Sequence, residues 1–305
     1  MTNNNSTFLM PLYPILYDDI VRRALLEDVG HGDLTTDSIV SPMETTVAAM
    51  TARAPGRIAG IEAALHAFYC LDAAIETELL LRDGTDVETG QTIAVIRGPA
   101  RPILSAERTA LNLLARLSGI ATATRDIAAS VAQYKARVVC TRKTTPGLRL
   151  LEKYAVRAGG GDNHRFGLDD AVLVKDNHIA IAGGVSEAVR RARRRVGHMV
   201  KIEVEVDTLQ QLEVVLNEKV DAVLLDNMPP ETLLEAVRMV DGRIITEASG
   251  GITPETAAAV AATGVDLLSI GWITQRAPAM DLALDIYCQR DLPQITAGKR
   301  RKPSS

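Results

Sequence analysis

The chain has 305 residues, 47% of them hydrophobic, so it can bury the core of one large α/β domain or of two smaller domains. Its formal net charge is -4 and its isoelectric point is about 5.8, which excludes a global positive field that would hold nucleic acid or an anionic membrane. Any anion must therefore be met by a local group of cations.

The cysteines and the N-terminus indicate a cytoplasmic protein. The three cysteines, Cys70, Cys140 and Cys288, are widely separated. This spacing is typical of reduced thiols and offers no disulfide or zinc framework. No signal peptide is expected, because residues 1–19 lack a basic leader and contain Pro11 and Pro14. No apolar run reaches the roughly 20 residues that a membrane span needs.

Residues 1–118 predict an α+β domain. Strands separated by tight Gly and Asp turns are expected within 44–54, 56–60 and 76–98. Amphipathic helices are expected over 61–74 and 103–119. Strands so close in sequence form antiparallel sheets, so we expect such a sheet with helices on one face.

The domain boundary is expected near Gly119, within a nearly continuous helical region over 103–133 that has no flexible linker. The second domain then covers 119–284. The segment 285–305 is expected either to return to the first domain or to be disordered, because it ends in a polar, basic tail.

The second domain shows strands that alternate with helices, which predicts a parallel sheet. The expected strands are 137–140, 171–174, 200–206, 221–226, 243–248 and 266–271. Glu205, Asp226 and Glu247 recur near strand ends at a spacing of 21 residues, which suits one strand, one helix and two short loops. At least six parallel strands are expected.

Charged residues follow several of these strands. The carboxyl ends of parallel strands meet at one edge of the sheet, where active sites lie. "TRKTTPG" (141–147) follows the first strand, and its Arg142 and Lys143 offer a planar fork and a point charge for an oxyanion. An ordinary solvated turn is the alternative for this segment. Lys175 follows the next strand, where we expect it to serve the site and not merely to face solvent.

Two kinds of glycine-rich segment suggest close approach of a ligand. "AGGGDNHRFG" (158–167) places His164 and Arg165 directly after three glycines, although a flexible surface loop is the alternative. Ser249, Gly250 and Gly251 precede an expected helix, and Gly271 follows the next strand. Backbone N–H groups at these two neighbouring strand ends predict a phosphate site.

Glu205 and Asp226 are expected on neighbouring strands, a placement that suits Mg²⁺ carrying a diphosphate. The alternative is a structural ion pair with a cation of the same rim. The two interpretations are compatible in an enzyme without substrate.

Six segments taken together resemble quinolinate phosphoribosyltransferases, also called carboxylating nicotinate-nucleotide pyrophosphorylases. The segments are "TRKTTPGLR", "GGGDNHRFGL", "VKDNHI", "IEVEV", "LLDN" and "EASGGI", in that order. The resemblance implies an N-terminal open-faced sandwich, an incomplete parallel α/β barrel, and a homodimer that shares its active sites. It also implies conversion of quinolinate and phosphoribosyl pyrophosphate to nicotinate mononucleotide, diphosphate and CO2 with Mg²⁺, in de novo NAD synthesis.

The resemblance assigns roles to individual residues. The quinolinate carboxylates would be met by Arg142, His164, Arg165 and, from the partner subunit, the residue equivalent to Arg108. Lys143 and Lys175 would lie between the dicarboxylate and the diphosphate, and Glu205 and Asp226 would engage ribose and metal; these four are the expected catalytic residues. The remaining expected substrate contacts are Thr141, Ser249, Gly250, Gly251, Ile270 and Gly271.

One departure and two alternatives remain. Relatives often carry a histidine a few residues after the second phosphate glycine, where this chain has Trp272 and Gln275; Arg276 is a candidate replacement.

A molybdenum-transport-associated relative shares "TRKT" and the glycine loop, but "KDNH" favours quinolinate. A non-catalytic phosphate-binding or nucleotide-binding regulator would not need both Glu205 and Asp226.

Overall fold

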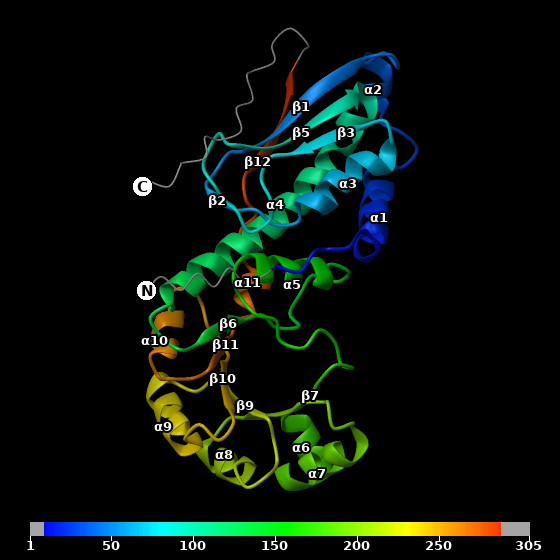
Figure 1. Cartoon of the computed structure of the whole chain (residues 1–305). Coiled ribbons are helices and arrows are strands. Elements are labelled where there is room, and N and C mark those ends of the chain that lie inside the picture. Colours follow the sequence, from blue (N-terminus) through cyan, green and yellow to red (C-terminus); the bar gives the residue numbers. More distant parts are fainter. Residues whose placement is uncertain (1–8, 288–305) are drawn as a thin grey trace. The chain divides into compact units, whose positions relative to one another are not determined.

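The computed structural model describes residues 9–287 and divides them into two units (Figure 1). The first unit contains residues 9–122 and 278–287, and the second contains residues 123–277. The boundary expected near Gly119 falls inside helix α4 (Ala100–Ser130), which begins in the first unit and ends in the second. The expected tail from 288 onward lies outside the described residues.

The first unit is built on an antiparallel sheet with strand order β12-β1-β5-β3. Its strands are β1 (Thr45–Ala52), β3 (Glu76–Leu79), β5 (Thr92–Pro99) and β12 (Leu282–Tyr287), with a separate pair, β2 (Gly56–Arg57) and β4 (Asp86–Val87). Its other helical elements are η1 (Pro14–Leu16), α1 (Asp18–Val29), α2 (Leu34–Ile39) and α3 (Ile61–Leu71). The α+β prediction is confirmed. Strand β12, which pairs with β1 from Val47 to Ala52, returns to this unit from the far end of the sequence.

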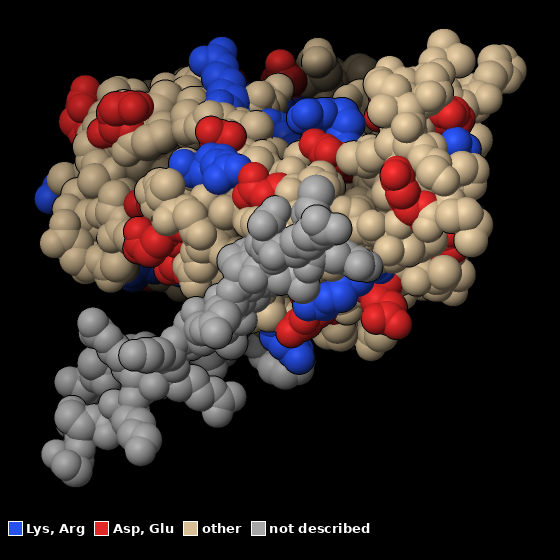
Figure 2. All heavy atoms as spheres, turned by 90° about the horizontal axis from the view of Figure 1, so that it is seen from above, with Lys and Arg blue, Asp and Glu red and all other residues tan. Residues whose placement is uncertain are grey.

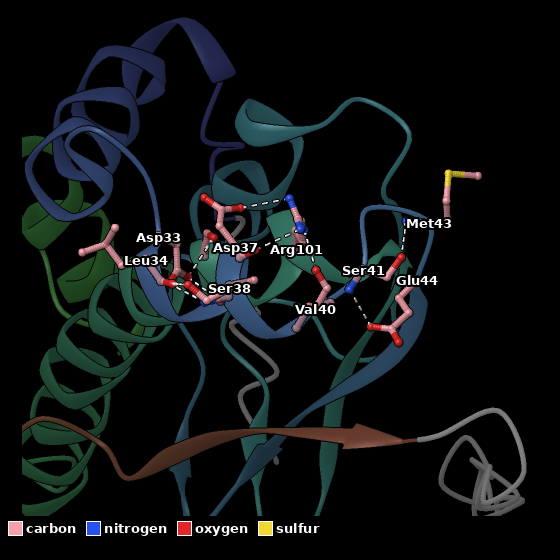
Figure 3. A network of polar contacts seen from close by, with 11 residues as sticks. Asp33, Leu34, Asp37, Ser38, Val40, Ser41, Met43, Glu44 and Arg101 are labelled. Atoms are coloured by element: carbon pink, nitrogen blue, oxygen red, sulfur yellow. Dashed lines mark hydrogen bonds and ion pairs between the residues drawn. The ribbon is translucent and has the colours of Figure 1, made fainter.

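A polar network fixes α2 against α4 within the first unit (Figure 3). The Asp33 carboxylate caps α2 by accepting from the Thr36 N–H at 3.0 Å, and it also accepts from the Ser105 hydroxyl of α4 at 3.0 Å. The Arg101 guanidinium donates to the Val40 and Asp37 carbonyl oxygens. Arg108 lies two turns further along α4 on the same face as Arg101, so this network steadies the segment that carries Arg108.

The second unit contains a six-stranded, wholly parallel sheet in the order β6-β11-β10-β9-β8-β7. The strands are β6 (Arg137–Val139), β7 (Val172–Val174), β8 (Ile202–Val206), β9 (Ala222–Asp226), β10 (Ile245–Ser249) and β11 (Leu267–Ser269). Because β6 and β7 are edge strands of this sheet, the barrel is incomplete, as the resemblance implies. All six expected strands are confirmed to within a few residues at each end.

Helices alternate with these strands in the second unit. They are α5 (Arg149–Ala158), α6 (Asp176–Ala182), α7 (Val185–Arg195), α8 (Leu209–Val215), α9 (Pro230–Val240), α10 (Ala257–Ala261) and α11 (Trp272–Gln275). Local sequence explains several helix starts. Thr208 and Gln211 form a capping box at α8, and Pro230 occupies the first position of α9.

The charged side chains on the surface shown in Figure 2 are of mixed sign. On the face shown in Figure 2, Lys and Arg side chains are interspersed with Asp and Glu, and neither sign forms a continuous area.

Across residues 9–287, no helix combines the length and the apolar sequence that a bilayer crossing requires.

Candidate active site

A cavity of about 280 Å³ opens where the strands of the second unit end, and it is lined by four cationic and two acidic side chains. The cations are Arg142, Lys143, Arg165 and Lys175, and the acids are Glu205 and Asp226. Thr141, His164, Ser249, Gly250 and Gly271 complete the predicted residues that line it. The concentration of cations in one cavity of an acidic chain is what a site for multiply charged anions requires.

The two arginines of this cavity lack partners for part of their hydrogen-bonding capacity. Among the described residues, the Nε atoms of Arg142 and Arg165 are buried and make no hydrogen bond. Burial, followed by repulsion from the Arg142 charge, lowers the pKa of Arg165. An oxyanion bound between the two guanidiniums would accept from the unpaired donors and relieve that repulsion.

The segment 141–147 is anchored to α5 by hydrogen bonds. The buried Glu152 carboxylate accepts from the Thr145 N–H at 3.1 Å and from its hydroxyl at 2.8 Å. On the other side, the Thr274 hydroxyl donates to the Lys143 carbonyl at 2.8 Å. The segment is therefore an anchored loop at the cavity, and not a freely solvated turn.

The glycine-rich loop is fixed by Lys153 of α5. Lys153 is fully buried, and its ammonium donates to the His164 carbonyl at 2.8 Å. Arg165 is held in turn, because its guanidinium donates to the Ala171 carbonyl at 2.8 Å. The loop that presents His164 and Arg165 is thus tied to α5 and to the segment before β7.

His164 uses both of its ring nitrogens. Its Nδ1 accepts from the Arg165 backbone N–H at 2.8 Å, and its Nε2 lies 3.0 Å from the Glu203 carboxylate. Nε2 is therefore assigned as the nitrogen that carries hydrogen. Burial opposes a charge on His164, but the Glu203 hydrogen bond and the Glu247 charge outweigh it and raise the pKa of the imidazole.

The carboxylates Glu205 and Asp226 lie on the adjacent strands β8 and β9. Glu205 accepts from the Lys175 ammonium at 2.7 Å, so the ion pair that the sequence left open is present. Lys175 keeps 45% of its side chain exposed, which leaves it accessible from the cavity. Asp226 accepts from the side-chain amide of Asn227 at 2.6 Å.

These two carboxylates are a suitable donor set for Mg²⁺. This ion commonly binds one or two protein carboxylates and fills its remaining positions with waters and substrate phosphate oxygens. Glu205 and Asp226 are the acidic side chains that line the cavity. A metal carried in by a diphosphate would find this pair beside Lys143 and Lys175.

The glycines that follow β10 and β11 lie so close to neighbouring residues that an added side chain would collide with them or press against them. At Gly250, with φ of 96°, an added Cβ would stand 2.1 Å from the Asn227 side-chain oxygen and 2.8 Å from its backbone nitrogen. At Gly271, an added Cβ would stand 3.0 Å from the Lys143 side chain. Gly250 therefore requires glycine, whereas a side chain at 271 would require the Lys143 side chain to shift.

Three predicted site residues do not line the cavity. Gly251 follows Gly250 directly, and Ile270 is buried with its N–H donating to the Val139 carbonyl. Arg108 is exposed on α4 in the first unit. Its expected contribution to a partner's site stays a prediction.

The sequence did not predict every residue that lines the cavity or lies behind its lining. Leu173, Leu224 and Ser269 line the cavity, and Glu203 and Glu247 lie behind His164. Alternation along β8 could have identified Glu203, because residues two apart on a strand share a face with Glu205. Ser269 pairs in register with Ser249, so its equivalent strand-end position was an available signal.

Comparisons with known proteins agree with this architecture. The C-terminal domain model of quinolinate phosphoribosyl transferase matches residues 120–285, and the N-terminal domain model matches residues 33–118. A probable carboxylating nicotinate-nucleotide pyrophosphorylase of Bacillus subtilis is 44% identical over 88% of this chain and 92% of its own length. The Mycobacterium leprae enzyme is 43% identical over 88% and 96% of the two chains.

A solved structure shows the same fold. The nicotinate-nucleotide pyrophosphorylase from Francisella tularensis superposes with a TM-score of 0.87 at 39% identity, covering 91% of this chain and 98% of the other. The family models match both units in sequence, and the relatives cover nearly all of both chains. The chain belongs to the quinolinate phosphoribosyltransferase family, a family of pentosyltransferases.

Proposed function

We propose that this enzyme joins quinolinate to phosphoribosyl pyrophosphate and yields nicotinate mononucleotide, diphosphate and CO2, with Mg²⁺, as a step of NAD biosynthesis. The observation that carries the proposal is the pair of buried Nε donors on Arg142 and Arg165, which line one cavity and have no hydrogen-bond partner among the described residues. Two guanidiniums that each keep an unused donor fit a planar dicarboxylate. The proposal agrees with the names of the relatives.

In the proposed reaction, the quinolinate nitrogen displaces diphosphate at the first ribose carbon. Positive charge develops on the ribose as the bond to diphosphate breaks, and the carboxylates of Glu205 and Asp226 stabilise it. Lys143 and Lys175 neutralise the departing diphosphate. Mg²⁺, when bound at Glu205 and Asp226, would supply further charge neutralisation at the diphosphate oxygens.

The second part of the reaction is loss of a carboxylate from the alkylated ring. The carboxylate beside the ring nitrogen leaves as CO2, and the bonding electrons remain on the ring carbon, where the cationic nitrogen stabilises them until a proton adds. The arginines hold the ring in place, so most of the catalytic effect comes from positioning and from neutralising charge.

The direct test supplies the purified full chain with quinolinate, phosphoribosyl pyrophosphate and Mg²⁺. We expect equal amounts of CO2 and nicotinate mononucleotide, and no product after chelation of the metal. Absence of turnover with quinolinate, with turnover of nicotinate instead, would contradict the proposal.

A shared active site is also part of the proposal, with the residue at 108 reaching a neighbouring subunit. Arg108→Ala and Lys143→Ala should each abolish most activity, because each removes a cation that faces the substrates. Mixing the two inactive variants should restore up to about one quarter of the wild-type activity if Arg108 acts in a partner's site. A mixture that stays as inactive as the separate variants would contradict sharing.

Arg276 is the proposed substitute for the phosphate contact that Gln275 does not supply. It is exposed directly after α11, close in sequence to Gly271. Arg276→Ala should raise the Michaelis constant for phosphoribosyl pyrophosphate roughly tenfold, the loss expected for one charged hydrogen bond. Arg238→Ala, an exposed arginine on α9, is the matched control, and equal constants in the two variants would remove the proposed role.

A further inference from the structure

A buried acid and imidazole cluster lies behind the cation-lined wall of the cavity. It consists of His164, Glu203 and Glu247, whose polar atoms all lie within 4.8 Å of one another. Glu203 and Glu247 come from β8 and β10, the strands on either side of β9. Of the three residues, His164 lines the cavity, and the Glu247 side chain behind it is only 3% exposed.

The cluster contains fewer donors than its carboxyl groups need. His164 has one hydrogen on Nε2, which it directs to Glu203 at 3.0 Å. Glu247 Oε1 lies 3.5 Å from the same nitrogen, makes no hydrogen bond within the described part of the chain, and is buried. A buried carboxylate oxygen without a donor is costly, whereas a protonated carboxyl at this position is not.

Two groups of the cluster, His164 and Glu247, have raised pKa values, but they differ in what protonation would break. His164 gains a proton only at Nδ1, where it would lose the hydrogen bond from the Arg165 N–H. Glu247 Oε1 gains a proton without losing a hydrogen bond to any described residue. Glu247 is therefore the better proton acceptor of the two.

Groups around Glu247 shift the pKa of its carboxyl group in both directions. Burial, followed by repulsion from Glu203 on β8, raises the pKa of Glu247 to about 7, while the His164 charge and a hydrogen bond with Ser269 on β11 oppose the shift. The charge of the Lys153 ammonium on α5 lowers the pKa of His164. An additional anion in the cavity, on the far side of His164, would favour the protonated carboxyl further.

We propose that Glu247 is a positioning residue that takes up a proton when a dicarboxylate enters the cavity. The proton removes the negative charge of Glu247, which would otherwise repel the substrate. It leaves intact the hydrogen bond from the Arg165 N–H to His164. This inference rests on the proposed function, because it assumes that the cavity binds quinolinate. The bound complex then holds more protons than the free protein, so quinolinate binds more tightly as pH falls towards the pKa of about 7 of the free protein, and the effect levels off below it.

The experiment is calorimetric titration of the full chain with quinolinate in buffers that differ in ionisation enthalpy. The dependence of the observed heat on the buffer gives the number of protons taken up. We expect uptake of a fraction of one proton per site, greatest between about pH 7 and pH 8, and tighter binding at lower pH by up to tenfold per unit shift in pKa.

Two variants and one control make the result specific. Glu247→Gln keeps the size of the side chain and should abolish the proton uptake and the pH dependence of the dissociation constant. Glu203→Gln removes the like charge and should move the uptake to lower pH. Glu231→Gln, at an exposed position in the first turn of α9, should behave as wild type. Thermal melting confirms that each variant is folded.

The outcomes separate the two proposals. Uptake that persists unchanged in Glu247→Gln would assign the proton to another group, such as His164 or Glu203, and overturn the inference, while quinolinate binding would leave the proposed function intact. Wild-type protein that neither binds nor converts quinolinate would overturn the proposed function, and the inference with it.

Discussion

Glu205→Gln is expected to lower kcat by about 10²-fold to 10³-fold, the range found when one group that stabilises transition-state charge is removed. Glutamine keeps the shape and can still accept a hydrogen bond from Lys175, which lies 2.7 Å from the Glu205 carboxylate. What is lost is the negative charge proposed to face the developing positive charge on the ribose. The same change should raise the Mg²⁺ concentration needed for half-maximal activity, because one of the two proposed carboxylate ligands is gone.

The structural alternative predicts a different result for Glu205→Gln. If Glu205 served only as the partner of Lys175, the variant would lose at most about 1 kcal/mol of stability, since an ion pair with one half-exposed member contributes little. Thermal melting and steady-state kinetics distinguish the two. Glu187→Gln, which removes a carboxylate paired with Arg190 and Arg191 on α7, is the control and should leave kcat unchanged. A nearly wild-type kcat for Glu205→Gln would refute its catalytic role.

Arg142→Lys is expected to raise the Michaelis constant for quinolinate by about tenfold to 100-fold, equivalent to the loss of a charge-assisted bidentate contact. Lysine preserves the charge but loses the planar fork and the Nε donor that is buried without a partner. The Michaelis constant for phosphoribosyl pyrophosphate should change less than twofold, because Lys143 and Lys175 are retained.

Two comparisons sharpen the test of Arg142. Arg165→Lys should give a similar selective loss, since its Nε is buried and unpaired in the same cavity. Arg238→Lys, at an exposed position on α9, should change neither constant. Equal weakening of both substrates in Arg142→Lys would contradict the assignment of its guanidinium to a ring carboxylate.

The parallel strands were predictable because short apolar runs alternate with helical stretches and are followed by charged or glycine residues. Those positions after the strands predicted that Arg142, Lys175, Glu205 and Asp226 lie at one edge of the sheet, and the structure brings them into one cavity. The two-residue period of β8 also contained the signal for Glu203, but its role depends on His164, which comes from a distant loop.

Other features depend on contacts that no local pattern reports. Lys153 is a lysine, a residue type that is usually exposed, yet it is fully buried, because the His164 carbonyl and the Phe166 ring receive its ammonium. The elevated pKa of Glu247 arises from burial and from Glu203, on a strand 44 positions earlier in sequence. Such effects appear only when long-range packing is known.

The return of β12 to the first unit sets an order for folding during synthesis. The second unit is one continuous stretch, residues 123–277, and has all of its strands as soon as that stretch has left the ribosome. The first unit must wait for Leu282–Tyr287, and until then β1 presents an unpaired edge. Nascent chains, and chains truncated before residue 282, therefore combine a complete catalytic sheet with an open, association-prone edge at the opposite end of the sequence.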